Sequence, residues 1–125
     1  MKEEMLRYID ERIAWHQGEQ ARLKAEYRQD EANHMQIAIN VYNIFRSTYQ
    51  AMKFDLDETV RRFSSIVNNW DESHKRACEH NDEDKRLIEE IKIARAMELL
   101  RRAKETYNPV GFLKKCRLVI AGDED

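Results

Sequence analysis

The stretch that decides the fold runs from Glu31 to Lys53 and reads EANHMQIAINVYNIFRSTYQAMK. Its apolar side chains recur every three or four residues, which is the spacing of one face of an α-helix. They form two neighbouring stripes, one of Met35, Ala38, Tyr42, Phe45, Tyr49 and Met52, the other of Ile37, Val41, Ile44 and Ala51. A helix that is apolar over this much of its circumference must contact neighbours on two sides. We therefore expect residues 31–53 to form the most buried helix of the protein.

Regular apolar seams also mark the stretches on either side of this helix. One covers roughly residues 2–28 and consists of Leu6, Ile9, Ile13, His16, Gln20, Leu23 and Tyr27. The other covers roughly 56–80 and consists of Leu56, Val60, Phe63, Val67, Trp70, His74 and Ala77. Asp55, followed three residues later by Glu58, is a capping pair for the start of the second of these helices. The two seams predict helices before and after the central one.

Residues 82–107 predict a fourth helix whose apolar face changes side along its length. Leu87, Ile88, Ile91 and Ala94 share one side, whereas Ile93, Ala96, Met97, Leu100, Ala103 and Tyr107 lie mostly on the other. We expect the first half to pack in the core and the second half to be covered by the C-terminal tail or another subunit. Asn108-Pro109 ends this helix and can begin a short one over 109–119. Residues 122–125 are expected to be a disordered acidic tail.

The composition agrees with an all-α fold. Three glycines and one proline in 125 residues are too few turn formers for an all-β protein. We predict one domain over residues 1–121, an antiparallel four-helix bundle of two helical hairpins with a short C-terminal helix or tail. In the alternative, the seams continue through residues 28–31 and 80–83 to give two long helices in a coiled-coil-like dimer. The hairpins are favoured because polar residues fall on the seams there, as a turn would leave them.

Charge and cysteine content narrow the class of protein. The formal net charge of −2 argues against a general nucleic-acid binder, which would be strongly basic. No apolar run approaches the roughly 20 residues needed to cross a bilayer, and the first residues lack the apolar segment of a secretory signal. Cys78 and Cys116 form no CxxC motif and are expected to be reduced thiols. These features indicate a cytoplasmic protein.

A metal-binding bundle is one alternative function. Glu31 with His34 and Asp71 with His74 are two carboxylate-x-x-His steps, and residues three apart share a helix face. Bundles that bind two metal ions use Glu-x-x-His steps of this kind. In a hairpin model both steps would lie at the same end of the bundle. No further carboxylate falls on an apolar face in mid-helix, so the four residues are weak ligand candidates and no cofactor is predicted.

A nucleic-acid accessory protein is the second alternative. Residues 92–117 hold eight basic and two acidic side chains, and the densest basic positions are Arg101, Arg102, Lys114, Lys115 and Arg117. Such a patch can attract phosphates, anionic lipid or an acidic protein face. Flat aromatic side chains that could stack on bases are almost absent among these residues. A nucleic-acid partner is therefore disfavoured, although the patch remains a candidate binding surface.

The leading hypothesis is a non-enzymatic module that binds a protein, with its own copy as first partner. No nucleophile with a neighbouring base and no phosphate-binding loop is present, so we predict that the chain is not an enzyme. Tyr8 and Trp15 lie seven residues apart off the first seam, beside Met5 and Arg12. Large aromatics and arginine anchor interfaces. The predicted interface is Tyr8 and Trp15, together with the apolar half-face of Met97, Leu100 and Tyr107, and a two-fold homodimer is its simplest use.

Overall fold

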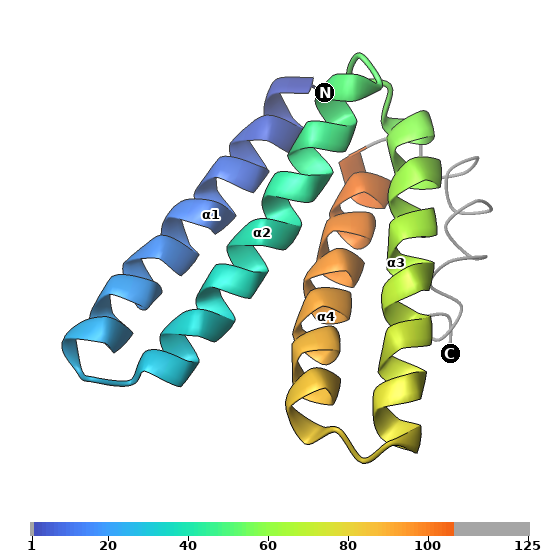
Figure 1. Cartoon of the computed structure of the whole chain (residues 1–125). Helices are drawn as coiled ribbons and strands as arrows, with labels where there is room; N and C mark the ends of the chain where they lie inside the picture. Colours follow the sequence, from blue (N-terminus) through green and yellow to red (C-terminus); the bar gives the residue numbers. More distant parts are fainter. Residues whose placement is uncertain (1, 107–125) are drawn as a thin grey trace.

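The structure of the protein is a computed structural model that describes residues 2–106. These residues form four helices, α1 (Lys2–Ala25), α2 (Gln29–Ala51), α3 (Leu56–Glu79) and α4 (Glu83–Thr106). Figure 1 shows that α1 pairs with α2 and α3 with α4, each as an antiparallel hairpin. The predicted all-α bundle of two hairpins is confirmed, and turns interrupt both of the long helices of the alternative. The predicted short helix 109–119 and the acidic tail 122–125 lie outside the described residues.

The helix ends follow local capping chemistry. Asp55 precedes α3, and its side chain accepts a hydrogen bond from the backbone N–H of Glu58 at 3.1 Å, as the sequence predicts. Asp82 plays the same part before α4, where its carboxylate accepts from the backbone N–H of Lys85 at 3.1 Å. Asn81, one residue earlier, has a positive φ of 55°, a conformation that asparagine tolerates better than most residues. These two acidic caps set the residues at which α3 and α4 begin.

α2 contacts neighbours on more than one side, as its two apolar stripes predict, and both α2 and α4 contact all three other helices. Its buried aromatic side chains form the centre of the core, where the Phe45 and Phe63 rings meet edge to face at 5.0 Å between centroids. α4 packs against α2 over a long stretch and against α1 over a short one. The α1–α2 hairpin is therefore attached to the α3–α4 hairpin mainly through the contact between α2 and α4.

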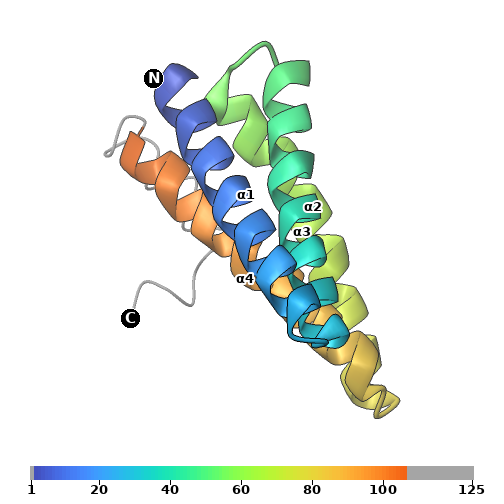
Figure 2. The same cartoon turned by 90° about the vertical axis from the view of Figure 1, so that its left-hand side faces the viewer.

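The two hairpins diverge toward the ends that carry the 26–28 and 80–82 turns (Figure 1), and both turns lie at the same end of the bundle in the second view as well (Figure 2). This divergence reverses the expectation for α4. Its second half is core, with Ala96, Leu99, Leu100 and Ala103 fully buried. Its first half faces the opening, where Leu87 is 41% exposed. The reason is geometric, because α4 reaches α2 closely only beyond the point where the hairpins separate. No helix among residues 2–106 has the length and apolar character to cross a bilayer.

Candidate functional site

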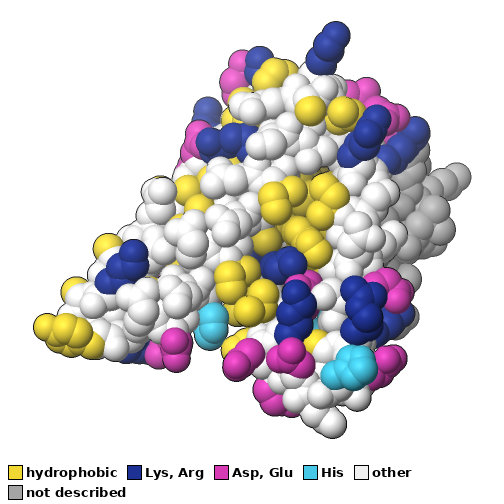
Figure 3. All heavy atoms as spheres, viewed as in Figure 1, with side chains coloured by type: hydrophobic (Ala, Val, Ile, Leu, Met, Phe, Trp, Pro, Cys, Tyr) yellow, Lys and Arg dark blue, Asp and Glu magenta, His cyan; other side chains and the backbone are white. Residues whose placement is uncertain are grey.

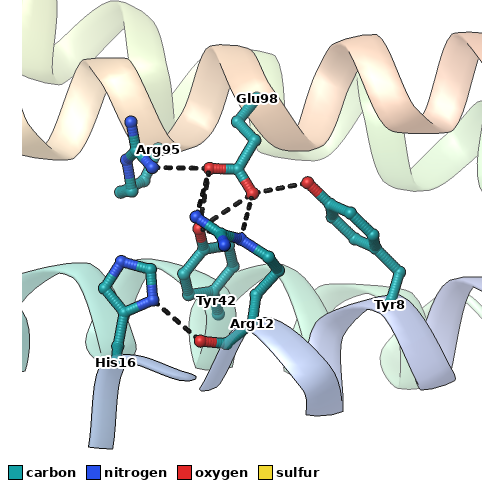
Figure 4. Close-up of polar contacts among 6 residues, drawn as sticks. All are labelled: Tyr8, Arg12, His16, Tyr42, Arg95 and Glu98. Atoms are coloured by element: carbon teal, nitrogen blue, oxygen red, sulfur yellow. Dashed lines mark hydrogen bonds and ion pairs between the residues drawn. The ribbon is translucent and has the colours of Figure 1, made fainter. Parts of the chain in front are cut away.

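A cluster of polar side chains joins three helices around the carboxylate of Glu98 on α4 (Figure 4). Tyr8 of α1 donates its hydroxyl hydrogen to this carboxylate at 2.5 Å, and Tyr42 of α2 donates at 2.8 Å. Arg12 of α1 donates from Nε at 2.9 Å, and Arg95 of α4 donates at 2.6 Å. Four donors thus occupy both carboxylate oxygens. We call these five residues the Glu98 cluster.

The Glu98 cluster keeps its carboxylate ionised. Burial by itself would raise the pKa of Glu98, but the hydrogen bonds from Tyr8, Tyr42 and Arg12 outweigh burial and hold it below its usual value. Burial and the hydrogen bond to Glu98 raise the pKa of the Tyr8 and Tyr42 hydroxyls. Both phenols therefore stay protonated and keep donating. A carboxylate with its oxygens committed in this way serves as a clamp between helices and has little capacity to act as a base or to hold a metal ion.

His16 is buried beside the cluster, with 4% of its surface exposed. Its Nδ1 lies 2.7 Å from the backbone carbonyl oxygen of Arg12. A carbonyl oxygen can only accept, so Nδ1 carries the proton of the neutral ring and Nε2 is the free acceptor. Burial lowers the pKa of His16, and the nearby guanidinium groups of Arg12 and Arg95 lower it further. The ring is therefore neutral at pH 7.

A groove runs between the two diverging hairpins, on the side of the Glu98 cluster that is nearer the 26–28 and 80–82 turns. Its walls are Arg12, Trp15 and His16 of α1, His34, Met35 and Ala38 of α2, and Leu87, Ile91, Ala94 and Arg95 of α4. We call it the wedge groove. His34 and Leu87 also line its continuation toward the turns, where Asp30 and Asp84 lie. Trp15 is 53% exposed and Leu87 is 41% exposed, so the groove presents a large apolar side chain from each hairpin.

The opposite side of the junction between the hairpins is also apolar. Figure 3 shows that on the face seen in Figure 1 apolar side chains gather where the hairpins meet, whereas charged side chains crowd the end of the α3–α4 hairpin. A second pocket there is lined by Ile37, Asn40, Val41, Ile44, Trp70, Ile88 and Lys92. Trp70 is partly covered by Lys92, whose ammonium lies 4.8 Å from the ring centroid. This side is thus more fully covered than the wedge groove.

The structure does not bring the four metal candidates together. Glu31 forms an ion pair with Arg28, and His34 lines the wedge groove. Nε2 of His74 lies 2.9 Å from Glu90 of α4, and Asp71 faces Lys75 at 3.8 Å. Within residues 2–106, no three His, Cys, Asp or Glu side chains gather as they would around a metal ion. Both steps lie toward the end of the bundle that carries the 26–28 and 80–82 turns, as the hairpin model predicts, but the two hairpins diverge there and the steps do not meet.

Of the basic candidates, only Arg101 and Arg102 lie within the described residues. Arg101 is exposed, and the guanidinium of Arg102 stacks over the Tyr8 ring at 5.0 Å and pairs with Glu105 at 3.9 Å. Arg102 is therefore partly engaged within the bundle. Lys114, Lys115 and Arg117 lie beyond residue 106 and outside the described part.

The interface candidates divide between core and surface. Leu100 is fully buried and Met97 half-buried against the core, and Tyr8 gives its hydroxyl to Glu98. In this structure Leu100 has no surface to offer a partner, because the second half of α4 packs inside the bundle. Trp15 is exposed in the wedge groove, while Tyr107 lies outside the described residues.

The sequence reading missed Glu98, Leu87 and the buried Glu89. Arg95 and Arg102, three residues before and four after Glu98, were a usable signal, because a glutamate flanked at helical spacing by arginines beside Leu99 and Leu100 is placed for a buried ion pair. Nothing in the sequence marks Leu87 as exposed. Comparison with known protein families, with curated proteins and with solved structures finds no match for this chain.

Proposed function

We propose that this protein is a cytoplasmic, non-enzymatic interaction module that forms a two-fold homodimer through the wedge groove. The observation that carries the proposal is the exposure of Trp15 and Leu87 on the two walls of one groove. Tyr27, the third exposed large apolar side chain of the described residues, lies in a turn and lines none of the grooves described above. Large apolar side chains exposed in pairs around a concave surface are typical of a binding site.

The chemistry of the wedge groove is that of an interface. Tryptophan, arginine and methionine are enriched where proteins bind one another, and the groove holds Trp15, Arg12 and Met35 together. The Trp15 ring contacts the His16 ring, with 4.9 Å between the ring centroids, and the Arg12 guanidinium lies 5.4 Å from the Trp15 ring centroid. A rigid, pre-oriented aromatic side chain loses little conformational entropy on binding. These contacts make Trp15 the expected anchor.

Charge complementarity supports a second copy as the occupant. The middle of the wedge groove carries Arg12 and Arg95 against the single charge of Glu98, whereas its continuation toward the turns carries Asp30 and Asp84. A two-fold axis across the groove sets the acidic end of one copy against the basic middle of the other. The same patch is then used twice, as two-fold contacts require.

The absence of an enzymatic role is also a proposal, supported by the same geometry. In the Glu98 cluster the carboxylate accepts from four hydrogen-bond donors, so no reactive group is left available there. The exposed Cys78 has His74 at 3.9 Å, a long contact on one exposed helix face without an enclosed pocket for a substrate.

Sedimentation equilibrium across a concentration series tests the dimer. We expect the protein to dimerise, and Trp15→Ala combined with Leu87→Ala to weaken the dimer at least about tenfold, as loss of an interface anchor does. Tyr27→Ala is the control, since it removes an exposed aromatic side chain that lies outside the groove. A protein that stays monomeric up to about 1 mM, or a dimer that the double variant leaves unchanged, contradicts the proposal.

A further inference from the structure

The loop between the two hairpins holds an unusual backbone conformation. Lys53 and Phe54 are consecutive residues with positive φ, 54° and 64°, and neither is glycine. This left-handed region is unfavourable for residues that carry a Cβ atom. The other two turns each contain one such residue, Tyr27 and Asn81. The α2–α3 loop is therefore the turn of the described chain that would gain most from straightening.

The loop contains neither of the two residues that most strongly break a helix. Met52-Lys53-Phe54-Asp55 contains neither glycine nor proline. The buried positions of α2 and α3 would also share one stripe if the helix continued, because they follow one another at steps of three and four residues when Met52 is included. The positions on this stripe are Tyr42, Phe45, Tyr49, Met52, Leu56, Val60 and Phe63. A continuous helix from α2 through α3 would thus keep its apolar side chains on one face.

The junction between the hairpins is suited to exchange between chains. The Glu98 cluster takes Tyr8, Arg12 and Tyr42 from the α1–α2 hairpin, and Glu98 with Arg95 from the α3–α4 hairpin. All its contacts across the junction can form equally between two copies. The same holds for the Phe45–Phe63 ring contact, which also joins the two hairpins.

We propose that two copies of this chain exchange their α1–α2 hairpins, with α2, the 52–55 loop and α3 becoming one continuous helix in each copy. Each Glu98 cluster is then completed by the partner copy. The exchange removes two left-handed residues per chain and adds no new buried surface apart from the straightened loop. This inference does not depend on the wedge groove and goes beyond the dimer proposed above.

Three contacts hold the loop closed in the single chain. Phe54 packs its ring on Tyr49 at 5.2 Å, and the ammonium of Lys2 lies 4.0 Å from the Phe54 ring centroid. Asp55 caps α3. Straightening the loop gives up these contacts, so the exchanged dimer is favoured only at high protein concentration during folding. Once formed, it separates slowly, because both hairpins must first leave the core.

Refolding from denaturant at about 10 µM and about 1 mM, followed by size exclusion with light scattering, tests the exchange. We expect a dimer fraction that rises with refolding concentration and persists for hours after dilution. Lys53 is exposed, so its substitutions leave the core intact. Lys53→Gly tolerates positive φ and should lower the dimer fraction at least about threefold, whereas Lys53→Val disfavours it and should raise the fraction. Tyr27→Gly, which relieves a left-handed residue in another turn, should change nothing.

Two measurements separate this dimer from one made through the wedge groove. The exchanged dimer should survive Trp15→Ala with Leu87→Ala, and small-angle scattering should show a particle containing a helix about 75 Å long, from 1.5 Å per residue over 29–79. A dimer that dissociates within minutes of dilution, or that the double variant abolishes, overturns the exchange while leaving the groove dimer standing. Lys53→Val that refolds only as monomer at about 1 mM also overturns it.

Discussion

α4 buries two glutamates in opposite ways. Glu98 receives hydrogen bonds from Tyr8 and Arg12 of α1 and from Tyr42 of α2, so three of its four donors lie across the junction of the two hairpins. Glu89 is more deeply buried, with 1% of its side chain exposed, yet the partners found for it are Lys85 and Lys92 of its own helix. One of its carboxylate oxygens is buried without a hydrogen-bond partner.

The comparison of the two glutamates shows that a more deeply buried carboxylate need not contribute more to the fold. A buried carboxylate costs free energy, and pairing recovers it only when the geometry is good and the remaining lone pairs are satisfied. Glu98 meets that condition and links three helices. Glu89 does not, and its ion pairs would exist in the isolated helix. We therefore expect Glu98 to specify how the hairpins dock and Glu89 to contribute little to the fold.

Removing the Glu98 carboxylate is expected to have the largest effect. Glu98→Ala leaves the fully buried Tyr42 hydroxyl and the Arg12 guanidinium without their acceptor, and should lower the free energy of unfolding by about 3 kcal/mol. Urea denaturation followed by circular dichroism measures it. Glu105→Ala is the control, since Glu105 is an exposed glutamate of the same helix that pairs with Arg102 at 3.9 Å. Equal stabilities of the two variants would show that the cluster holds nothing together.

Replacing Glu89 should act in the opposite direction. Glu89→Met keeps the volume, removes the cost of burying a charge and leaves Lys85 and Lys92 able to reach solvent, so stability should stay equal or rise by about 1 kcal/mol. The same urea experiment measures it, with Glu89→Ala as a check that any loss comes from a cavity and not from charge. A clear loss of stability in Glu89→Met would mean that this carboxylate also holds the two helices of the hairpin together.

The helices could be predicted from sequence because each depends on a local pattern. The seams through Leu56, Phe63 and Trp70 and through the two stripes of α2 set which faces are buried, and Asp55 marked the start of α3. The Glu98 cluster could not be assembled in this way. Three of its four donors come from residues 8, 12 and 42, and their meeting point with Glu98 depends on the angle between the hairpins.

The same angle explains why the wedge groove was missed. The apolar half of α4 that contains Leu87 and Ile91 has the pattern of a core face, and it would be one if the hairpins were parallel. They diverge, so this half faces an opening, while Leu100, which was assigned to an interface, lies in the core. The periodicity of apolar residues indicates which side chains avoid water. It does not indicate whether a neighbouring helix or a second molecule covers them.

The smallest effect we predict is a dependence of stability on pH through His16, which lies at the boundary between the Glu98 cluster and the open groove. The pKa of His16 in the folded protein is below the ordinary value of about 6.5, so the unfolded chain binds a proton first as pH falls. The stabilisation is fully present above pH 6.5 and is lost as pH falls toward and through the lower folded pKa, with a slope of at most about 1.4 kcal/mol per pH unit for one proton. The free energy of unfolding between pH 7.5 and 5.0 should therefore fall more steeply for the wild type than for His16→Gln.

The substitution His16→Gln removes the imidazole but keeps a neutral polar side chain at the same buried position. If the free energy of unfolding of His16→Gln fell with pH as steeply as that of the wild type, the His16 ring would have to be exposed to water in the wedge groove. It could not then be enclosed beside the Glu98 cluster. The boundary between the clamped and the open halves of the junction would then lie above His16, closer to Tyr42.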